Sequence, residues 1–240
     1  MPKVSKIYMR QNGVEKQVRP YKRVPWANTL AYYKFDWNLN DSSWNNNTWT
    51  ADGTVSYATA GEWQCLSISW WNNCVKTPIS ETFFGSAFTI AWWFRFSSIS
   101  SVMRIMWWQY NSQTAQYSDR ANIQYESWFW WFQFYSYNWQ RTSWNWTPVA
   151  NTWYHIVVVW WWVANDLKAY INWAELTKTR SAYDYTTYSW AVVAFWWNWD
   201  WSLSNYYMAG NIDNAILENK AWNATEVSNY YNQTKSLYWL

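Results

Sequence analysis

Many turns of this chain are written with tryptophan at the position where a tight turn needs glycine. With Gly in place of Trp, these pairs would be D-G, S-G and N-G, the dipeptides that most strongly indicate tight turns. A residue with a side chain in the left-handed backbone conformation costs about 1–2 kcal/mol, and the whole stability of a domain is about 5–15 kcal/mol. The turn signals lie between runs that are typical of short strands. The pairs are Asp36-Trp37, Ser43-Trp44, Asn138-Trp139, Asn145-Trp146, Asn172-Trp173, Asn198-Trp199 and Asp200-Trp201.

The balance of glycine and tryptophan agrees with this reading of the turns. The chain has 5 Gly and 29 Trp in 240 residues, whereas average usage would give roughly 17 Gly. We interpret most of the Trp residues as mistranslated glycines, because the UGA codon is read as Gly in certain uncultivated bacterial lineages and as Trp in another variant code. The alternative is a tryptophan-rich protein that uses its indoles for binding. The interpretation predicts positive φ or loop exposure at several of Trp37, Trp44, Trp139, Trp146, Trp173 and Trp199, and buried strand positions for Trp93 and Trp153.

Length and charge limit the class of protein. A chain of 240 residues suits one large all-β domain or two small ones. The net charge of +3 and the 14% of charged residues give no argument for a nucleic-acid partner. Once the Trp residues are discounted, no apolar run reaches the ~18 residues of a membrane span. The first residues lack the apolar core of a secretion signal, which leaves open a cytoplasmic protein, a virion protein or a piece of a longer one.

From residue 30 onward, short runs rich in β-branched and aromatic residues alternate with turn signals. This spacing is typical of an all-β sandwich or barrel. Alternation is clear after residue 152, where Trp153, His155 and Val157 share one face. We expect strands over Leu30–Phe35, Gln64–Ser69, Asn73–Thr77, Phe88–Phe96, Val102–Met106, Asn122–Tyr125, Phe129–Tyr135, Tyr154–Val159, Leu167–Ile171, Ala191–Phe195 and Tyr207–Leu217.

The N-terminal residues differ from the rest. Residues 1–25 are expected to form a separate hairpin and linker, with the hairpin turn at Asn12-Gly13 and an extended Pro-flanked segment after it. Such a hairpin is not stable alone, so it would dock on a neighbour or join a preceding module. Residues 26–240 would then form the β-sandwich domain.

One short helix is expected near the C-terminus. Asn223 and Glu226 have the spacing of a capping box. Val227, Tyr230 and Tyr231 follow at the spacing of one apolar stripe, which would pack against a sheet.

The two cysteines are expected to be free thiols. Cys65 and Cys74 flank Trp70-Trp71-Asn72-Asn73, which we interpret as a turn that places Cys74 opposite Ser69. A disulfide would then be out of reach, because Cα atoms more than ~7 Å apart cannot be bridged. With 2 Cys and 1 His in the chain, a zinc site is excluded by the number of ligands.

With glycine restored in the turns, several segments match one family in the family's own order. They are Leu30–Asn47, Phe88–Phe94, Thr152–Val157, Leu167–Trp173, Gly210–Ala215 and Asn219–Val227. Phe88–Phe94 is similar to an "F-T-I-S-x-W" strand, and Gly210–Ala215 to a closing "G-x-I-D-E-V" strand. Together these segments resemble the laminin-G-like domains of the concanavalin A-like lectin/glucanase family. The resemblance implies a two-sheet antiparallel β-sandwich (jelly roll) and true tryptophans at Trp93, Trp153 and Trp222.

Catalysis is not expected. Glycoside hydrolases need two carboxylates that flank the scissile bond, and those of this fold carry them as E-x-D-x-x-E on one strand, a run that this sequence lacks. Asp213 and Glu218 are five residues apart and therefore fall on opposite faces of a strand. We expect His155 to be a packed structural histidine, because no Ser, Cys or acidic residue stands near it in the sequence. A glucanase remains an alternative only because the fold allows it.

One Asx-rich loop could bind calcium, which prefers carboxylate and amide oxygens as ligands. The resemblance implies a structural calcium near this loop and the strand of Asp213. We take Asp36, Asn45 and Asp213 as the candidate metal ligands. The alternative is that Asp and Asn here cap turns through their own backbone. The loop contains Asp36, Asn38, Asn40, Asp41 and Asn45.

The expected function is non-catalytic recognition of carbohydrate or of a surface protein through loops, at the cell surface or outside the cell. Aromatic rings could stack on sugars, although ordinary strand positions would explain the same residues. A second possibility is a structural or receptor-binding component of a phage particle, in view of the N-terminal segment and the missing secretion signal. The candidate sugar-stacking residues are Tyr135, Tyr137, Tyr183, Tyr185, Tyr188, Tyr206 and Tyr207.

Overall fold

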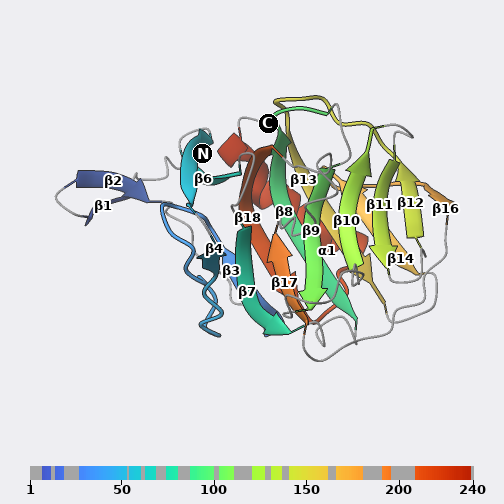
Figure 1. Ribbon diagram of the computed structural model, residues 1–240, viewed down its shortest axis with the longest axis horizontal. Helices are drawn as coiled ribbons and strands as arrows, with labels where there is room; N and C mark the ends of the chain where they lie inside the picture. The colour runs from blue at the N-terminus through green and yellow to red at the C-terminus, as the bar shows by residue number, and fades with distance from the viewer. Residues whose placement is uncertain are drawn as a thin grey trace.

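Two antiparallel sheets lie face to face in the computed structural model (Figure 1). The arrangement confirms the predicted all-β fold, a two-sheet antiparallel β-sandwich with one short C-terminal helix. The structure describes residues 7–11, 14–18, 27–52, 54–60, 63–68, 74–80, 87–99, 103–110, 121–127, 131–136, 141–161, 166–180, 191–195 and 209–238.

In the described part of the chain each sheet has eight strands, and we name the sheets by their place in Figure 1. The front sheet contains, in spatial order, β16 (Lys178–Arg180), β12 (Arg141–Asn145), β11 (Trp131–Ser136), β10 (Ala121–Glu126), β9 (Met103–Tyr110), β17 (Ala191–Phe195), β7 (Cys74–Ser80) and β4 (Thr50–Asp52). The back sheet contains β15 (Ala174–Glu175), β14 (Leu167–Ile171), β13 (Trp153–Trp160), β8 (Phe88–Phe96), β18 (Gly210–Glu218), β6 (Trp63–Ile68) and β5 (Ser56–Ala60), and β3 (Thr29–Tyr33) also pairs with β18.

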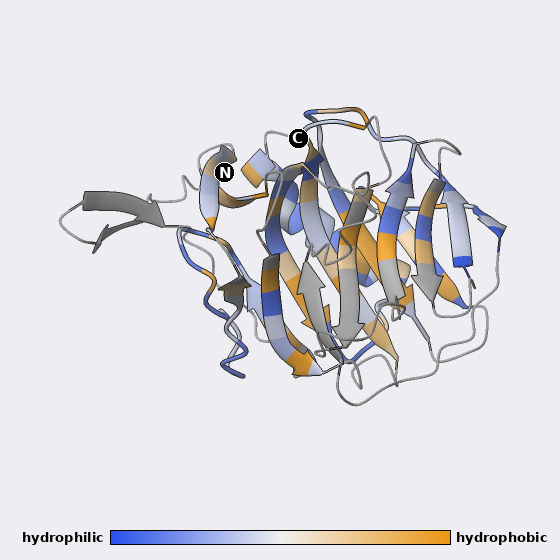
Figure 2. Cartoon of the chain, viewed as in Figure 1, coloured by the Kyte–Doolittle hydropathy of each residue, from blue (hydrophilic) through white to orange (hydrophobic). Residues whose placement is uncertain are grey.

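The main core fills the space between the sheets. Alternate residues of β8, among them Trp92 and Phe94, meet Phe132 and Phe134 of β11 in one buried cluster. On β10, Ile123 and Tyr125 belong to the same buried cluster, and Figure 2 shows hydrophobic and hydrophilic bands side by side along this sheet. Because side chains of a strand point alternately to its two faces, the residues between these positions lie on the outer faces of the sandwich.

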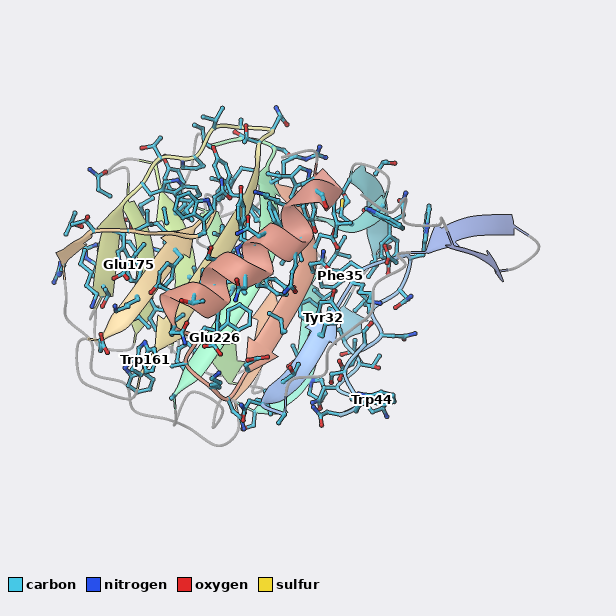
Figure 3. All side chains as sticks on the ribbon, turned by 180° about the vertical axis from the view of Figure 1, so that it is seen from behind. Tyr32, Phe35, Trp44, Trp161, Glu175 and Glu226 are labelled. Atoms are coloured by element: carbon cyan, nitrogen blue, oxygen red, sulfur yellow. The ribbon has the colours of Figure 1, made fainter. Side chains whose placement is uncertain are left out.

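A helix covers the outer face of the back sheet (Figure 3). Helix α1 (Ala224–Thr234) begins at Asn223, whose side chain forms the predicted capping box with Glu226. It is followed by the 3-10 helix η3 (Lys235–Tyr238). The indole Nε1 of Trp93 donates a hydrogen bond to the hydroxyl of Thr234 (2.9 Å), which ties the helix to β8. The predicted apolar stripe is buried in this interface at Val227, Tyr230 and Tyr231.

The N-terminal hairpin pairs with neither large sheet. Strands β1 (Ile7–Gln11) and β2 (Val14–Val18) form a sheet of their own, with Gln11 opposite Val14. Whether residues 1–25 and 26–240 are separate domains stays a prediction. Within the described part of the chain, no helix is long and apolar enough to cross a membrane.

The expected pairing around the cysteines is wrong. Strands β6 and β7 belong to different sheets, so Cys65 lies in the back sheet and Cys74 in the front sheet. The chain crosses between the sheets at this point instead of forming a hairpin, because each strand has an apolar face to bury against the common core. Cys65 is free and buried, as expected, and its thiol lies 3.2 Å from the carbonyl oxygen of Ala58.

Three of the four turn tryptophans that the structure describes occupy the predicted kinds of position. Trp37 and Trp173 have φ of 63° and 75°. Trp44 is 83% exposed, and Figure 3 shows it at the outer end of its loop. Trp146 is different, because it is partly buried against Phe132 and Tyr154. Trp139 and Trp199 lie outside the described residues, whereas Trp93 and Trp153 are buried strand residues, as predicted.

Candidate functional site

Asp41 holds the Asx-rich loop between β3 and β4 in shape. Its Oδ1 accepts hydrogen bonds from the backbone N–H groups of Tyr32 (2.9 Å) and Ser43 (2.6 Å). Its Oδ2 accepts them from the N–H of Asn47 (2.8 Å) and from the Ser43 hydroxyl. The side-chain nitrogen of Asn45 donates to the carbonyl oxygen of Thr29 (2.6 Å), which fastens the loop to β3. Much of the polar character of the loop therefore serves its own backbone.

The three candidate calcium ligands lie in different surroundings. Asp36 is partly exposed at the start of the loop, and Asn45 is bound to β3. Asp213 is buried on β18, where it accepts hydrogen bonds from the Asn214 N–H (2.8 Å) and the Tyr238 hydroxyl (2.7 Å). A calcium ion at Asp213 would compete with both donors. Across the described ranges, no three Asp, Glu, His or Cys side chains gather in a group that could hold a metal ion. Calcium binding stays a prediction.

His155 is packed against aromatic rings, as predicted. Its ring lies 5.3 Å from those of Trp93 and Tyr230 and 6.0 Å from that of Tyr231. The side chain is fully buried, and neither ring nitrogen has a hydrogen-bond partner. Burial lowers the pKa of His155 to about 3, because the charged ring would lose its hydration. A neutral, enclosed ring cannot reach a substrate as a general base.

The candidate sugar-stacking tyrosines fall outside what the structure describes. For Tyr135 the backbone is described as part of β11, but the side chain is not. The other six lie in segments that are not described. They are Tyr137, Tyr183, Tyr185, Tyr188, Tyr206 and Tyr207.

A polar cluster lies on the outer face of the front sheet. Phe132 and Phe134 face the core, so Gln133 between them faces outward. The strand register places Gln124 of β10 and Ser143 of β12 on either side of Gln133. We name the set the front polar cluster; its members are Gln124, Glu126, Gln133, Arg141 and Ser143.

Glu126 is the centre of the front polar cluster. It accepts hydrogen bonds from the side-chain nitrogens of Gln124 (3.2 Å) and Gln133 (2.7 Å). The guanidinium of Arg141 lies 4.0 Å from it, and both side chains reach solvent, with 17% and 26% of their surfaces exposed for Glu126 and Arg141. The cluster is therefore an ordered array of amide, carboxylate and guanidinium groups that begins at the surface.

Two atoms of the front polar cluster lack hydrogen bonds. Gln133 and Ser143 are fully buried, and neither the Gln133 Oε1 nor the Ser143 hydroxyl has a partner. Buried polar atoms are nearly always satisfied, because each unsatisfied one costs about 1–3 kcal/mol. The cluster therefore has unused capacity for hydrogen bonds. Its one carboxylate, Glu126, does not make the acid pair that glycoside hydrolysis requires.

No protein-family model matches this sequence, and no curated protein matches it. Solved structures do match the fold. Domain 4 of AbnA, a GH43 extracellular arabinanase from Geobacillus stearothermophilus, was solved in complex with arabinotriose. It is 18% identical to this chain with a TM-score of 0.63, and the match covers 84% of this chain and 97% of that domain.

Structures of botulinum neurotoxins match equally well. A structure of botulinum neurotoxin type C, described as dependent on two ganglioside molecules for cell entry, is 15% identical with a TM-score of 0.64. The binding domain of botulinum neurotoxin DC in complex with SialylT is 15% identical with a TM-score of 0.63. These matches cover 86% of this chain but only 51% and 52% of the toxin chains, about half their length. At such identities they show the fold alone, a β-sandwich.

Proposed function

We propose that this chain is a non-catalytic recognition module that binds carbohydrate through the front polar cluster. The two buried polar atoms without partners, on Gln133 and Ser143, are the observation that carries the proposal. A sugar would first meet Glu126 and Arg141, which reach solvent. Its hydroxyl groups could bond to the enclosed Gln133 oxygen and Ser143 hydroxyl only by displacing the atoms that cover them. Glu126 and Arg141 would bind further hydroxyl groups at the surface end of the cluster.

The similar structures support this reading by analogy of fold. Domain 4 of AbnA was solved with arabinotriose bound, and a toxin binding domain with SialylT. The binding domain of botulinum neurotoxin DC was also solved in complex with rat synaptotagmin II. If the present chain bound a protein instead of a glycan, the proposed ligand class would change from carbohydrate to protein. A carbohydrate-binding role implies a place at the cell surface or outside the cell, which fractionation of the source cells followed by immunoblotting would test.

A glycan array with two variants of strand β12 tests the proposal. Ser143→Ala removes a hydroxyl on the outer face, and Thr142→Val removes one on the core face of the same strand. Neither hydroxyl has a protein partner, so neither change should cost the fold a hydrogen bond. One neutral hydrogen bond is worth about 0.5–1.5 kcal/mol, so Ser143→Ala should weaken binding of neutral glycans about 2- to 12-fold. Thr142→Val should leave it unchanged.

The array also has clear contrary outcomes. If no glycan binds, or if both variants bind as the unchanged protein does, the front polar cluster is not a carbohydrate site. If instead a protein partner is captured and Ser143→Ala releases it, the module recognises protein.

We also propose that the chain is a laminin-G-like domain in which Trp stands for Gly at most turns. The positive φ of Trp37 and Trp173 and the exposure of Trp44 support this. The intact mass of the protein from its source cells should then fall well below 29.3 kDa, because each glycine lacks an indole side chain. A measured mass of 29.3 kDa would end the proposal.

A further inference from the structure

A second polar row crosses the outer face of the back sheet beside the end of the helical cover. Strand pairing places Trp153 opposite Arg95, Arg95 opposite Asn211, and Asn211 opposite Ser67. Tyr238, at the end of η3, packs on Trp153 with ring centres 4.9 Å apart. Arg95 is only partly buried, whereas Asn211 and Trp153 are buried.

Neighbouring side chains fix the orientation of the Arg95 guanidinium. Its Nε and Nη2 both donate to the Oδ1 of Asn211, at 3.1 and 2.7 Å. Its central carbon lies 5.2 Å from the centre of the Trp153 ring, within the range of a cation–π interaction. Residues of β8, β18 and β13 thus hold the guanidinium in one position, which lowers the entropy lost when a ligand binds.

The fixed guanidinium has an unused edge. Arginine presents five N–H donors in a planar fork. The Nε–Nη2 edge is occupied by Asn211, and the outer Nη1–Nη2 edge remains, which is the edge that matches a carboxylate with two parallel hydrogen bonds. Ion pairs of the described residues include Arg141–Glu126, Lys168–Glu175 and Lys220–Glu226, and Arg95 has no acidic partner among the described residues.

A second cation lies on the same group of aromatic residues. The Lys235 Nζ is 5.4 Å from the ring centre of Tyr231, which belongs with Trp153 and Tyr238 to one buried cluster. Asn211 is a neutral acceptor, so it orients Arg95 without cancelling the charge. The carboxylate of Asp213, two residues along β18, is buried and accepts hydrogen bonds from Tyr238 and the Asn214 N–H. The groups of this region that reach solvent are therefore the cations Arg95 and Lys235, and they favour an anionic ligand.

We propose that Arg95, Asn211 and Trp153 form a binding site for the carboxylate of an acidic sugar, a uronic or sialic acid. Arg95 binds the carboxylate through its outer edge, and Lys235 adds attraction from the end of η3. Ser67 and Ser56, next in the row across the sheet, place hydroxyl groups beside the ring hydroxyls of the sugar. The choice of a sugar acid rests on the proposed function, but the site lies on the opposite sheet from the front polar cluster.

Matched pairs of ligands test the charge requirement. Calorimetric titrations would use tri-galacturonic acid against its methyl ester, and sialyllactose against lactose. We expect each acid to bind about 10-fold or more tightly than its neutral counterpart, because a bidentate arginine–carboxylate contact is a strong, charge-assisted one. Equal binding of acid and neutral forms would overturn the site, and so would an absence of binding by both acids.

Variants test the residues. Arg95→Lys keeps the charge but loses the planar fork, and it should weaken acid binding about 10-fold. Asn211→Asp supplies Arg95 with an internal carboxylate at nearly the same shape, so it should abolish acid binding while leaving the thermal stability unchanged or higher. Lys168→Gln removes one exposed charge from the same sheet and should have no effect. If the Asn211→Asp variant still binds the acids, the proposed contact between Arg95 and the ligand carboxylate is wrong. This result decides the question even if Arg95→Lys fails to fold.

Two further outcomes separate this proposal from the front polar cluster. If the unchanged protein fails to bind the sugar acids but binds neutral glycans in a way that Ser143→Ala weakens, the Arg95 site alone is overturned. Equal affinity for a glutamate-rich peptide and for the sugar acids would overturn the assignment to a sugar.

Discussion

The turn at Asn172 and Trp173 allows a direct test of backbone strain in this chain. The two residues have φ of 49° and 75°, and Ile171 pairs with Ala174, so they form a two-residue hairpin loop. Positive φ at both central residues is the geometry that favours Asn-Gly. Trp173→Gly and Trp173→Ala both remove the indole, so the difference in stability between them measures the cost of the backbone conformation alone.

The sign of the difference follows from two opposing effects. Alanine in the left-handed conformation costs about 1–2 kcal/mol. Glycine avoids this cost but loses about 0.5–1 kcal/mol more chain entropy on folding. Trp173→Gly should therefore be about 1 kcal/mol more stable than Trp173→Ala, or about 2–4 °C in Tm for a domain of this size.

Trp44 provides the matched control. It is 83% exposed and is not among the residues with positive φ. There Trp44→Gly should be about 0.5–1 kcal/mol less stable than Trp44→Ala, the opposite sign. Urea and thermal unfolding of the four variants measure both differences. If Trp173→Ala is as stable as Trp173→Gly, the turn does not require glycine and the argument from strain fails.

Other predictions concern protonation and metal binding. The pKa of His155 is about 3 in the folded protein and about 6.5 when unfolded, so the unfolded state binds the extra proton between these values. Stability should fall by about 1.4 kcal/mol per pH unit as the pH drops below 6.5. Urea unfolding at pH 7 and pH 4.5 measures this fall in the free energy of unfolding, and replacement of His155 by Phe should remove it. The ring signals of this single His in NMR should not shift down to pH 4. If Asp36, Asn45 and Asp213 bind calcium, excess CaCl2 should raise the Tm of EDTA-treated protein, and Asp36→Asn should prevent the rise; an unchanged Tm would count against the site.

Local sequence pattern predicted the elements that carry strong periodicity or a capping signal. Strands β8, β13 and β14 match their predicted ranges closely, since long apolar or alternating runs have one stable way to bury themselves. The helix was predictable because the capping box at Asn223 and Glu226 is a contact within a few residues.

Features that depend on partners far along the chain were not predicted. Strands β5, β12 and β16 are short, and their sequences have little β-strand pattern. Strands of this kind form because a neighbouring strand pairs with them, which the local sequence does not show. The separation of β6 and β7 into different sheets also depends on the core as a whole.

The front polar cluster was missed for the same reason. Gln124, Gln133 and Ser143 look like ordinary strand residues until the register places them side by side. The only local signal was a polar residue between two aromatics, as in Phe132-Gln133-Phe134. Asp41 was named in the Asx-rich loop, yet its role as the centre of the loop depends on the backbone of Tyr32, Ser43 and Asn47.

Whether a polar group is satisfied by the protein separates residues that hold the fold from residues that can bind a ligand. The Asp41 carboxylate accepts hydrogen bonds at both oxygens, whereas the Ser143 hydroxyl has no partner. Asp41→Asn would present an amide N–H2 to donors that now meet an oxygen. It should lower the free energy of unfolding by about 2–4 kcal/mol, since each buried donor left without a partner costs about 1–3 kcal/mol. Glycan binding by the folded Asp41→Asn variant should stay unchanged. Ser143→Ala should instead weaken glycan binding and leave the free energy of unfolding unchanged. If Asp41→Asn instead lost glycan binding and kept its stability, the Asx-rich loop and not the front sheet would be the binding surface.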